Sequence, residues 1–230
     1  TALTNPYMTA RMARAILRER FGVSSLLSAP DANPKVAKND KLGVMTAPLH
    51  LAPATLSGFN TCAGASAGCR EACLHTAGNP AYMENKGKAR VARTLAYFQA
   101  RGAFVTAWVA ELTKLHVKAS AANMTPGHRP NATSDIPFER VPVVREGVRY
   151  DNAMVAFPSI EFYDYTKVLK RALAFARGEM PANYHLTFSL SETNEAEAVQ
   201  VLQAGGNVAV VFSTRRGQPL PATYTLGGVT

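Results

Sequence analysis

The chain has 230 residues, of which 47% are hydrophobic and 18% charged, and its formal net charge is +9. This composition excludes a disordered protein, a coiled coil and a collagen, and no apolar run is long enough to span a membrane. The length suits one globular domain covering residues 1–230, and the positive charge favours anionic partners, either small molecules or nucleic acid.

The N-terminal region is predicted to contain a helix followed by a strand. Asn5 and Pro6 form a helix-start signal, which predicts a helix over residues 5–21. Residues 42–51 predict a strand, and a cysteine-containing loop over residues 57–79 follows directly. The sequence lacks an initial Met and stops in a strand-like segment, so we expect the natural chain to continue beyond both ends.

The central region is helical at first and then irregular. Residues 81–117 have helical composition, and Gly102 is the expected break between two helices because Gly costs roughly 1 kcal/mol relative to Ala in a helix interior. Residues 121–158 contain five prolines and predict loops with short strands near residues 129–133 and 141–144.

The C-terminal third alternates strands with helices. Asn194 and Glu197 form a variant of the capping box that opens the second of these helices. The predicted strands cover residues 160–166, 184–190 and 207–212, and the predicted helices cover residues 167–177 and 194–204. This alternation predicts βα units, a parallel sheet and therefore an α/β fold, arranged as a partial or complete TIM-like barrel.

All three cysteines of the chain, Cys62, Cys69 and Cys73, lie in one loop with the spacing C-x6-C-x3-C. In a chain without an export signal, such a cluster indicates a metal site in a reducing, cytoplasmic compartment. Thiolates bind zinc, copper(I) or iron–sulfur clusters, and we expect a 4Fe–4S cluster before zinc. The third alternative is a group of ordinary thiols.

Three thiolate ligands would leave one iron of the cluster open to a cofactor or substrate, as three ligands leave an open position in catalytic zinc sites. His75 could instead close a Cys3His zinc site, although a structural His is the simpler interpretation. The small residues between Cys62 and Cys69 let the backbone wrap closely, and their N–H groups could bond to cluster sulfurs.

Polar residues recur where predicted strands end, which is where ligands bind on parallel sheets. We expect Asp135, Lys167 and Glu192 to act in catalysis. The expected cofactor-binding or substrate-binding residues are Asn131, Ser134, Asp164, Ser189 and Arg215. The alternative for each is a local role, since Thr166 and Ser191 can cap helices and Asp135 is a common turn residue.

Several segments together resemble the phage "gene product eighty-eight" family over about residues 42–212. They are SGFNTCAGASAGCREACLHTAG, KARVARTLAYF, NATSDIP and FYDYTK. Ala63 stands where many relatives have Pro, and His75 where Tyr is usual. The resemblance implies a phage or prophage protein located in the host cytoplasm, with little defined biochemistry.

The family layout is similar to that of radical SAM proteins, in which a three-cysteine loop follows an early strand of a βα barrel. This chain departs from their usual C-x3-C-x2-C spacing and lacks a GGE-like motif. S-adenosylmethionine is therefore a candidate cofactor by analogy. The leading hypothesis is an iron–sulfur enzyme that acts on a small or anionic substrate.

Two other classes of function stay open. A zinc-stapled phage protein that binds nucleic acid is suggested by the net charge and by a basic helix carrying Lys86, Lys88, Arg90 and Arg93. The second open class is a structural zinc protein that binds a host protein.

Overall fold

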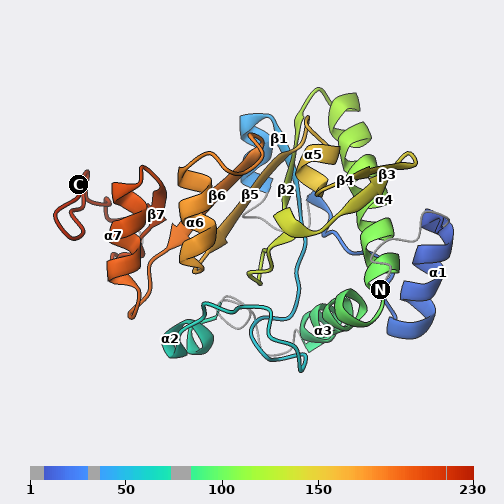
Figure 1. Cartoon of the computed structure of the whole chain (residues 1–230), viewed down its shortest axis with the longest axis horizontal. Helices are drawn as coiled ribbons and strands as arrows, with labels where there is room; N and C mark the ends of the chain where they lie inside the picture. Colours follow the sequence, from blue (N-terminus) through green and yellow to red (C-terminus); the bar gives the residue numbers. More distant parts are fainter. Residues whose placement is uncertain (1–7, 31–36, 74–83, 216) are drawn as a thin grey trace.

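The computed structural model describes residues 8–30, 37–73, 84–215 and 217–230, and it has a mixed α/β fold (Figure 1). Its main sheet has five strands in the order β1 (Val44–Pro48), β2 (Thr125–Arg129), β5 (Glu161–Thr166), β6 (Tyr184–Ser189) and β7 (Asn207–Ala209). Every neighbouring pair is parallel, so the predicted α/β class and parallel sheet are confirmed. A separate antiparallel pair joins β3 (Val143–Arg145) to β4 (Val148–Tyr150).

Of the predicted partial or complete TIM-like barrel, the complete form is wrong for the part of the chain that the structure describes. There, β1 and β7 are the two edges of an open sheet. Closing a barrel takes about eight tilted strands, and β7 offers a pairing length of only three residues. The strands nevertheless follow one another across the sheet in chain order, as they do within a segment of a βα barrel.

The helices flank the strands and connect them. In chain order they are α1 (Ala10–Phe21), the 3-10 helix η2 (Ala37–Leu42), α2 (Ala67–Glu71), α3 (Glu84–Gln99), α4 (Arg101–Ala121), the 3-10 helix η3 (Phe138–Arg140), α5 (Ala153–Ala156), α6 (Leu169–Ala176) and α7 (Glu195–Gln203). Within the described ranges, every helix is too short or too polar to cross a membrane.

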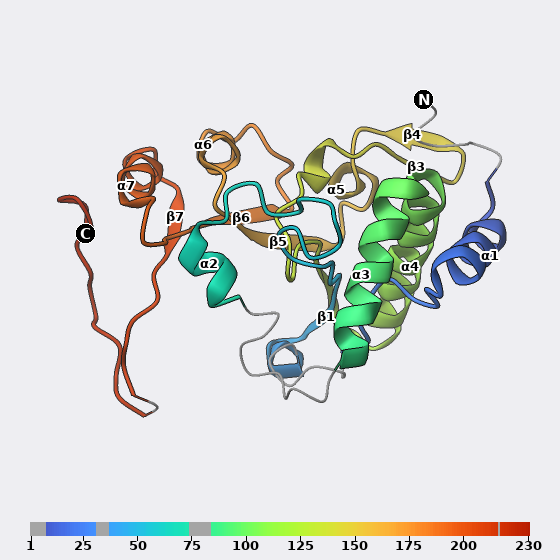
Figure 2. The ribbon, with the colours of Figure 1, turned by 90° about the horizontal axis from the view of Figure 1, so that it is seen from below.

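The large helices cover one face of the sheet. Figure 2 shows α6 and α7 on the same side of the strands, and α4 packs on β1 and β2 from that side as well. Residues on the covered face, such as Phe162 and Leu186, are buried, whereas Glu161, Tyr165 and His185 on the opposite face are exposed. Parallel sheets usually have both faces covered, so the exposed face of β5 and β6 is unusual for a sheet of this type.

A buried histidine fastens α4 to the sheet. Trp108 Nε1 donates to His128 Nε2 at 3.0 Å, so the other ring nitrogen carries the proton and donates to the carbonyl of Ala47 at 2.6 Å. Burial lowers the pKa of His128 to about 4, although the hydrogen bond to Ala47 acts in the opposite direction. The imidazole is therefore neutral at pH 7 and acts as part of the core.

Two predicted helix boundaries and one predicted capping bond differ from the structure. Helix α1 begins after Thr9, whose hydroxyl accepts the Met12 N–H at 3.2 Å, while residues 5–7 lie outside the described ranges. The two central helices break at Ala100, and Gly102 lies inside α4. Asn194 does precede α7, but its side chain accepts the Ser191 N–H at 2.7 Å in place of a capping-box bond.

Candidate functional site

The cysteine loop lies across the carboxyl ends of the strands. Seen from below, the segment between β1 and α2 passes in front of β5 and β6 (Figure 2). Two contacts hold it there: the Asp135 N–H donates to the Thr61 carbonyl at 2.7 Å, and the Gly68 N–H donates to Glu192 Oε1 at 2.9 Å. Residues far apart in the sequence thus position the loop.

Two glycines of the loop lie in close contact with residues after β5 and β6. A Cβ atom at Gly64 would lie 2.7 Å from the carbonyl oxygen of Lys167. A Cβ atom at Gly68 would lie 2.8 Å from Glu192 Oε1. The small residues between the cysteines therefore let the loop approach the ends of β5 and β6 at distances that a larger side chain would prevent.

Cys62 is half-buried beneath the segment that follows β1. The Ala54 N–H points at Cys62 Sγ at 3.3 Å, and the Thr61 hydroxyl lies 3.7 Å from the same sulfur. Ala54 has a φ of 48°, in the left-handed region that a residue with a side chain rarely adopts. Burial raises the pKa of the Cys62 thiol, and the nearby charges of Asp135 and Cys73 raise it further.

Cys69 and Cys73 lie at and just beyond the short helix α2. Ser66 caps this helix, and its hydroxyl accepts the Cys69 N–H at 3.1 Å. A separation of four residues corresponds to about one helical turn, which favours the same side of the helix for both thiols. Both side chains are partly exposed.

The donor types in the loop fit a soft metal, but the arrangement is not preassembled. Across the described ranges, no group of three or more His, Cys, Asp or Glu side chains is placed to hold a metal ion. His75, the possible fourth ligand, lies outside the described residues. Metal binding by the three cysteines stays a prediction.

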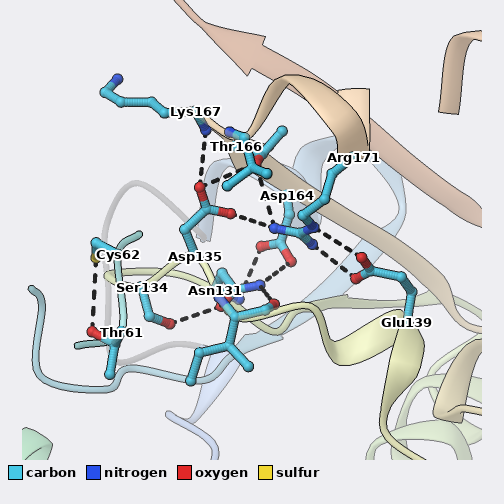
Figure 3. A network of polar contacts seen from close by, with 12 residues as sticks. Thr61, Cys62, Asn131, Ser134, Asp135, Glu139, Asp164, Thr166, Lys167 and Arg171 are labelled. Carbon is cyan, nitrogen blue, oxygen red and sulfur yellow. Dashed lines mark hydrogen bonds and ion pairs between the residues drawn. The ribbon is translucent and has the colours of Figure 1, made fainter. Parts of the chain in front are cut away.

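A buried hydrogen-bond network lies behind Cys62 (Figure 3). The backbone N–H and the side-chain Nδ2 of Asn131 donate to the two oxygens of Asp164 at 2.9 and 2.8 Å. The Ser134 hydroxyl donates to Asn131 Oδ1 at 2.8 Å. Burial raises the pKa of Asp164 to about 6, although Arg129 and Arg171 oppose this shift.

Arg171 is the centre of the same network and is only 4% exposed. Its guanidinium forms ion pairs with Asp135 and Glu139 and donates to the Tyr184 hydroxyl at 2.9 Å. Burial alone would lower the pKa of Arg171, but Tyr184, Glu139 and Asp135 raise it overall. The cation is therefore permanent.

Asp135 is surrounded by donors. One of its oxygens accepts the Thr166 hydroxyl at 3.0 Å and the Lys167 N–H at 2.9 Å, while the other faces Arg171. The Lys167 ammonium donates to the Ser189 hydroxyl at 2.8 Å. These bonds make Asp135 a better candidate for positioning the strand ends than for abstracting a proton.

A pocket of about 320 Å³ opens beside Cys62. Two cations, Arg101 and Arg140, lie in its wall together with Asn60 and Asp135. The Arg101 guanidinium stacks over the Tyr97 ring at 3.8 Å from the ring centroid, so its orientation is restricted. Such a wall suits a small molecule that carries a negative group.

The sequence matches the family model described as Gene product 88 over residues 25–229, which includes every predicted site residue. The chain belongs to this family of phage gene products. Among curated proteins and solved structures, no significant match to the chain is found.

In this gene product 88 chain, the structure brings together most of the polar residues predicted from strand ends. Hydrogen bonds and ion pairs join six of them, directly or through Tyr184 and Arg171: Asn131, Ser134, Asp135, Asp164, Lys167 and Ser189. Glu192 lies against the cysteine loop, where the Ser66 hydroxyl and the Gly68 N–H lower its pKa. Arg215 is different: it is exposed in the C-terminal extension, and its backbone N–H donates to Gln218 at 2.9 Å.

Sequence reasoning missed Arg171, Glu139 and Tyr184. The available signal was weak, since Arg171 stands among the apolar residues of α6 and its neighbour Lys170 is exposed. A charged residue on the apolar side of an amphipathic helix needs a buried partner. Glu139 is 32 positions away in the sequence, so no local pattern identifies that partner.

Proposed function

We propose that this family member is a metal-dependent phage enzyme in which Cys62, Cys69 and Cys73 bind an iron–sulfur cluster. One observation carries the proposal: the whole cysteine complement of the chain lies on a segment held across the carboxyl ends of parallel strands. Ligands of open α/β sheets bind at this edge. Because the thiols are not preassembled, the loop must close around the metal as it binds.

The electrostatic surroundings differ between the cysteines. Arg90, which is buried, lies close enough to Cys73 for their charges to interact. A cation is a favourable neighbour for a thiolate that binds a metal. At Cys62 the Ala54 N–H and the Thr61 hydroxyl oppose the effect of burial, but the pKa of the thiol is raised overall, so a bound metal would itself have to stabilise the thiolate there.

The residues around the loop have separate roles in this proposal. Arg101 and Arg140 bind the negative group of a small substrate in the pocket beside Cys62, and Tyr97 fixes the orientation of Arg101. Asp135 and Glu192, predicted as catalytic, act as positioning residues for the strand ends and the loop. A bound cluster would supply one-electron chemistry, and S-adenosylmethionine is the first cofactor to test.

The zinc-stapled nucleic-acid-binding protein is the weaker candidate. Arg90 is buried and Arg93 donates to the carbonyl of Ser25 at 2.9 Å, so the basic helix presents fewer free cations than its sequence suggests. Nucleic-acid backbones are bound by exposed cations.

Anaerobic purification tests the proposal, with iron, sulfide and zinc analysis and with visible and EPR spectra. We expect about four irons and four sulfides per chain and a brown chromophore, as for a 4Fe–4S cluster. Each Cys→Ser variant should lose most of this content, whereas His75→Ala should keep it.

Two results would overturn the cluster. The first is a colourless protein with one zinc per chain, together with loss of this zinc in His75→Ala, which would show a Cys3His zinc site. Protein that takes up neither metal, even after anaerobic reconstitution, would show that the cysteines are ordinary thiols.

A further inference from the structure

A second group of charged side chains lies around His50, where α3 approaches the residues that follow the carboxyl end of β1. His50 follows β1 by two residues, and Arg129 is the last residue of β2, opposite Pro48. The Leu49 N–H donates to the Arg129 carbonyl at 2.9 Å, which fixes the ends of the two strands side by side. His50 and Arg129 therefore both lie at the carboxyl ends of neighbouring strands, on the same edge of the sheet.

Helix α3 brings two further cations to this edge. The Ala52 N–H donates to the Thr94 hydroxyl at 2.8 Å, which holds the helix beside residues 50–52. Arg90 lies one helical turn before Thr94, and Arg93 is the residue directly before Thr94. Arg93 donates to the Ser25 carbonyl at 2.9 Å, so its side chain is held on this side of the helix.

The cations act on His50 together. Burial and the charges of Arg90, Arg93, Arg129 and Lys86 all lower the pKa of His50, together to about 4. The imidazole is neutral at pH 7, and one ring nitrogen lies 3.2 Å from the Ser28 hydroxyl. Two acids offset part of this charge, since Glu111 interacts with Arg93 and Asp164 with Arg129, and Glu111 also accepts the N–H groups of Leu26 and Leu27.

Arg129 carries a buried donor without an acceptor. Its Nε is buried and forms no hydrogen bond within the described ranges of the chain. Its guanidinium lies 4.9 Å from the centre of the Tyr165 ring, on the face of the sheet that no large helix covers among the described residues. A buried N–H group without a hydrogen-bond partner is unfavourable, so this atom can donate to an oxygen that a ligand brings.

We propose that Arg90, Arg93, Arg129 and Lys86 form a binding site for a small molecule that carries a phosphate group. Guanidinium groups match the oxygens of a phosphate in both geometry and charge. The neutral His50 can donate a hydrogen bond to the same group, and the exposed face around Tyr165 leaves room for the rest of the ligand. Arg90 also lies near Cys73, whereas Arg93 and Arg129 are the members of this site that the proposed metal loop does not use.

The recessed position favours a small ligand over a polymer. Arg90 is only 9% exposed, and His50, Arg93 and Arg129 are half-buried, so only Lys86 is at the surface. A nucleic-acid backbone would need exposed cations along a groove, whereas a small phosphate can enter a recess lined by arginines.

Titration with inorganic phosphate and pyrophosphate tests the proposal, by calorimetry and by the NMR signal of the His50 ring. We expect both anions to bind and to shift this ring signal at constant pH and ionic strength. Arg93→Gln and Arg129→Gln should each weaken binding at least tenfold. Lys88→Gln removes an exposed charge from the same helix and should change the affinity less than twofold.

Equal weakening in Lys88→Gln, or unchanged binding in Arg93→Gln, would show attraction to net charge alone and overturn the site. Acetate that binds as tightly as phosphate would overturn the phosphate assignment. An oligonucleotide that binds and is not displaced by pyrophosphate would show a nucleic-acid surface. Thermal unfolding followed by circular dichroism shows whether each variant is folded. If Arg129→Gln does not fold, the affinity of Arg93→Gln decides the test.

Discussion

The carboxylate of Glu192, at the end of β6, accepts the backbone N–H of Gly68 in the cysteine loop at 2.9 Å. The two residues are 124 positions apart in the sequence. This contact, together with the bond between Thr61 and Asp135, determines where the loop lies on the sheet. The position of the three cysteines therefore depends on residues that are not themselves ligands.

Glu192→Ala should loosen the loop without unfolding the sheet. The Gly68 N–H and the Ser66 hydroxyl would lose their acceptor, so amide hydrogen exchange should become faster over residues 60–73. If the loop binds metal, affinity should fall about tenfold, as for other residues that position metal ligands. Hydrogen exchange followed by mass spectrometry measures the first effect, and chelator competition the second.

Glu161→Ala is a matched control, because Glu161 is an exposed carboxylate at the opposite end of β5. Exchange over residues 60–73 should not change in this control. Unchanged exchange in Glu192→Ala would contradict the role given to its carboxylate.

Gly64→Ala should be more harmful than Gly68→Ala. A methyl group at position 64 would meet the backbone carbonyl of Lys167, which cannot move without the strand, whereas at position 68 it would meet the exposed side chain of Glu192, which can rotate away. Overpacking against backbone typically costs about 1–3 kcal/mol. Urea unfolding of the two variants provides the comparison, and equal stability losses would show that the loop adapts at both positions.

Arg171→Met should destabilise the protein strongly. The substitution keeps much of the side-chain volume but leaves Asp135 and Glu139 buried without their cation. Removing one partner of a buried ion pair costs about 3–5 kcal/mol. Arg177→Met, on the exposed end of the same helix, removes an ion pair with Glu179 and should have no detectable effect on urea unfolding.

His128 should stay neutral far below the usual range of histidine. Because burial lowers its pKa to about 4, NMR should show no titration of this ring between pH 5.5 and pH 8, with the proton on Nδ1. An unfolded His binds a proton below about 6.5, so this residue contributes stability above that pH and loses it as the pH falls toward 4. A His128 signal that titrates near 6.5 would contradict the buried arrangement.

The sequence predicts the C-terminal half of the sheet well because its strands carry a local signal. Residues 160–166 and 184–190 alternate buried and exposed positions, and the structure has β5 and β6 there. The strand-end rule also located Asn131, Asp164 and Lys167, because parallel strands bring their carboxyl ends to one edge.

Features that depend on distant residues were not predictable in this way. Strand β2 has the sequence TPGHR, which lacks strand propensity, and it forms because it pairs with β1 and β5 on either side. Gly127 permits that pairing, since a Cβ atom there would lie 2.9 Å from Thr46 Oγ1. The burial of Arg90 and the partners of Arg171 likewise arise only from the packing of separate elements.

Asp164→Asn should change how stability depends on pH. Burial raises the pKa of Asp164 to about 6 from an ordinary value of 3.8, so between these values the folded state holds more protons than the unfolded state. The contribution of this carboxyl to stability is therefore largest below pH 4 and decreases as the pH rises through 6. Two pKa units correspond to about 3 kcal/mol.

The asparagine variant keeps the shape of the side chain but cannot titrate, and it leaves His128 unchanged. Urea unfolding of both proteins between pH 4 and pH 7.5 should show the stability difference, native minus variant, falling by about 2–3 kcal/mol over this range. The opposite trend expected from His128 is present in both proteins and cancels in the difference. Parallel stability curves would show that the three donors from Asn131 and Tyr184 hold the carboxylate ionised at its ordinary pKa, against the effect of burial.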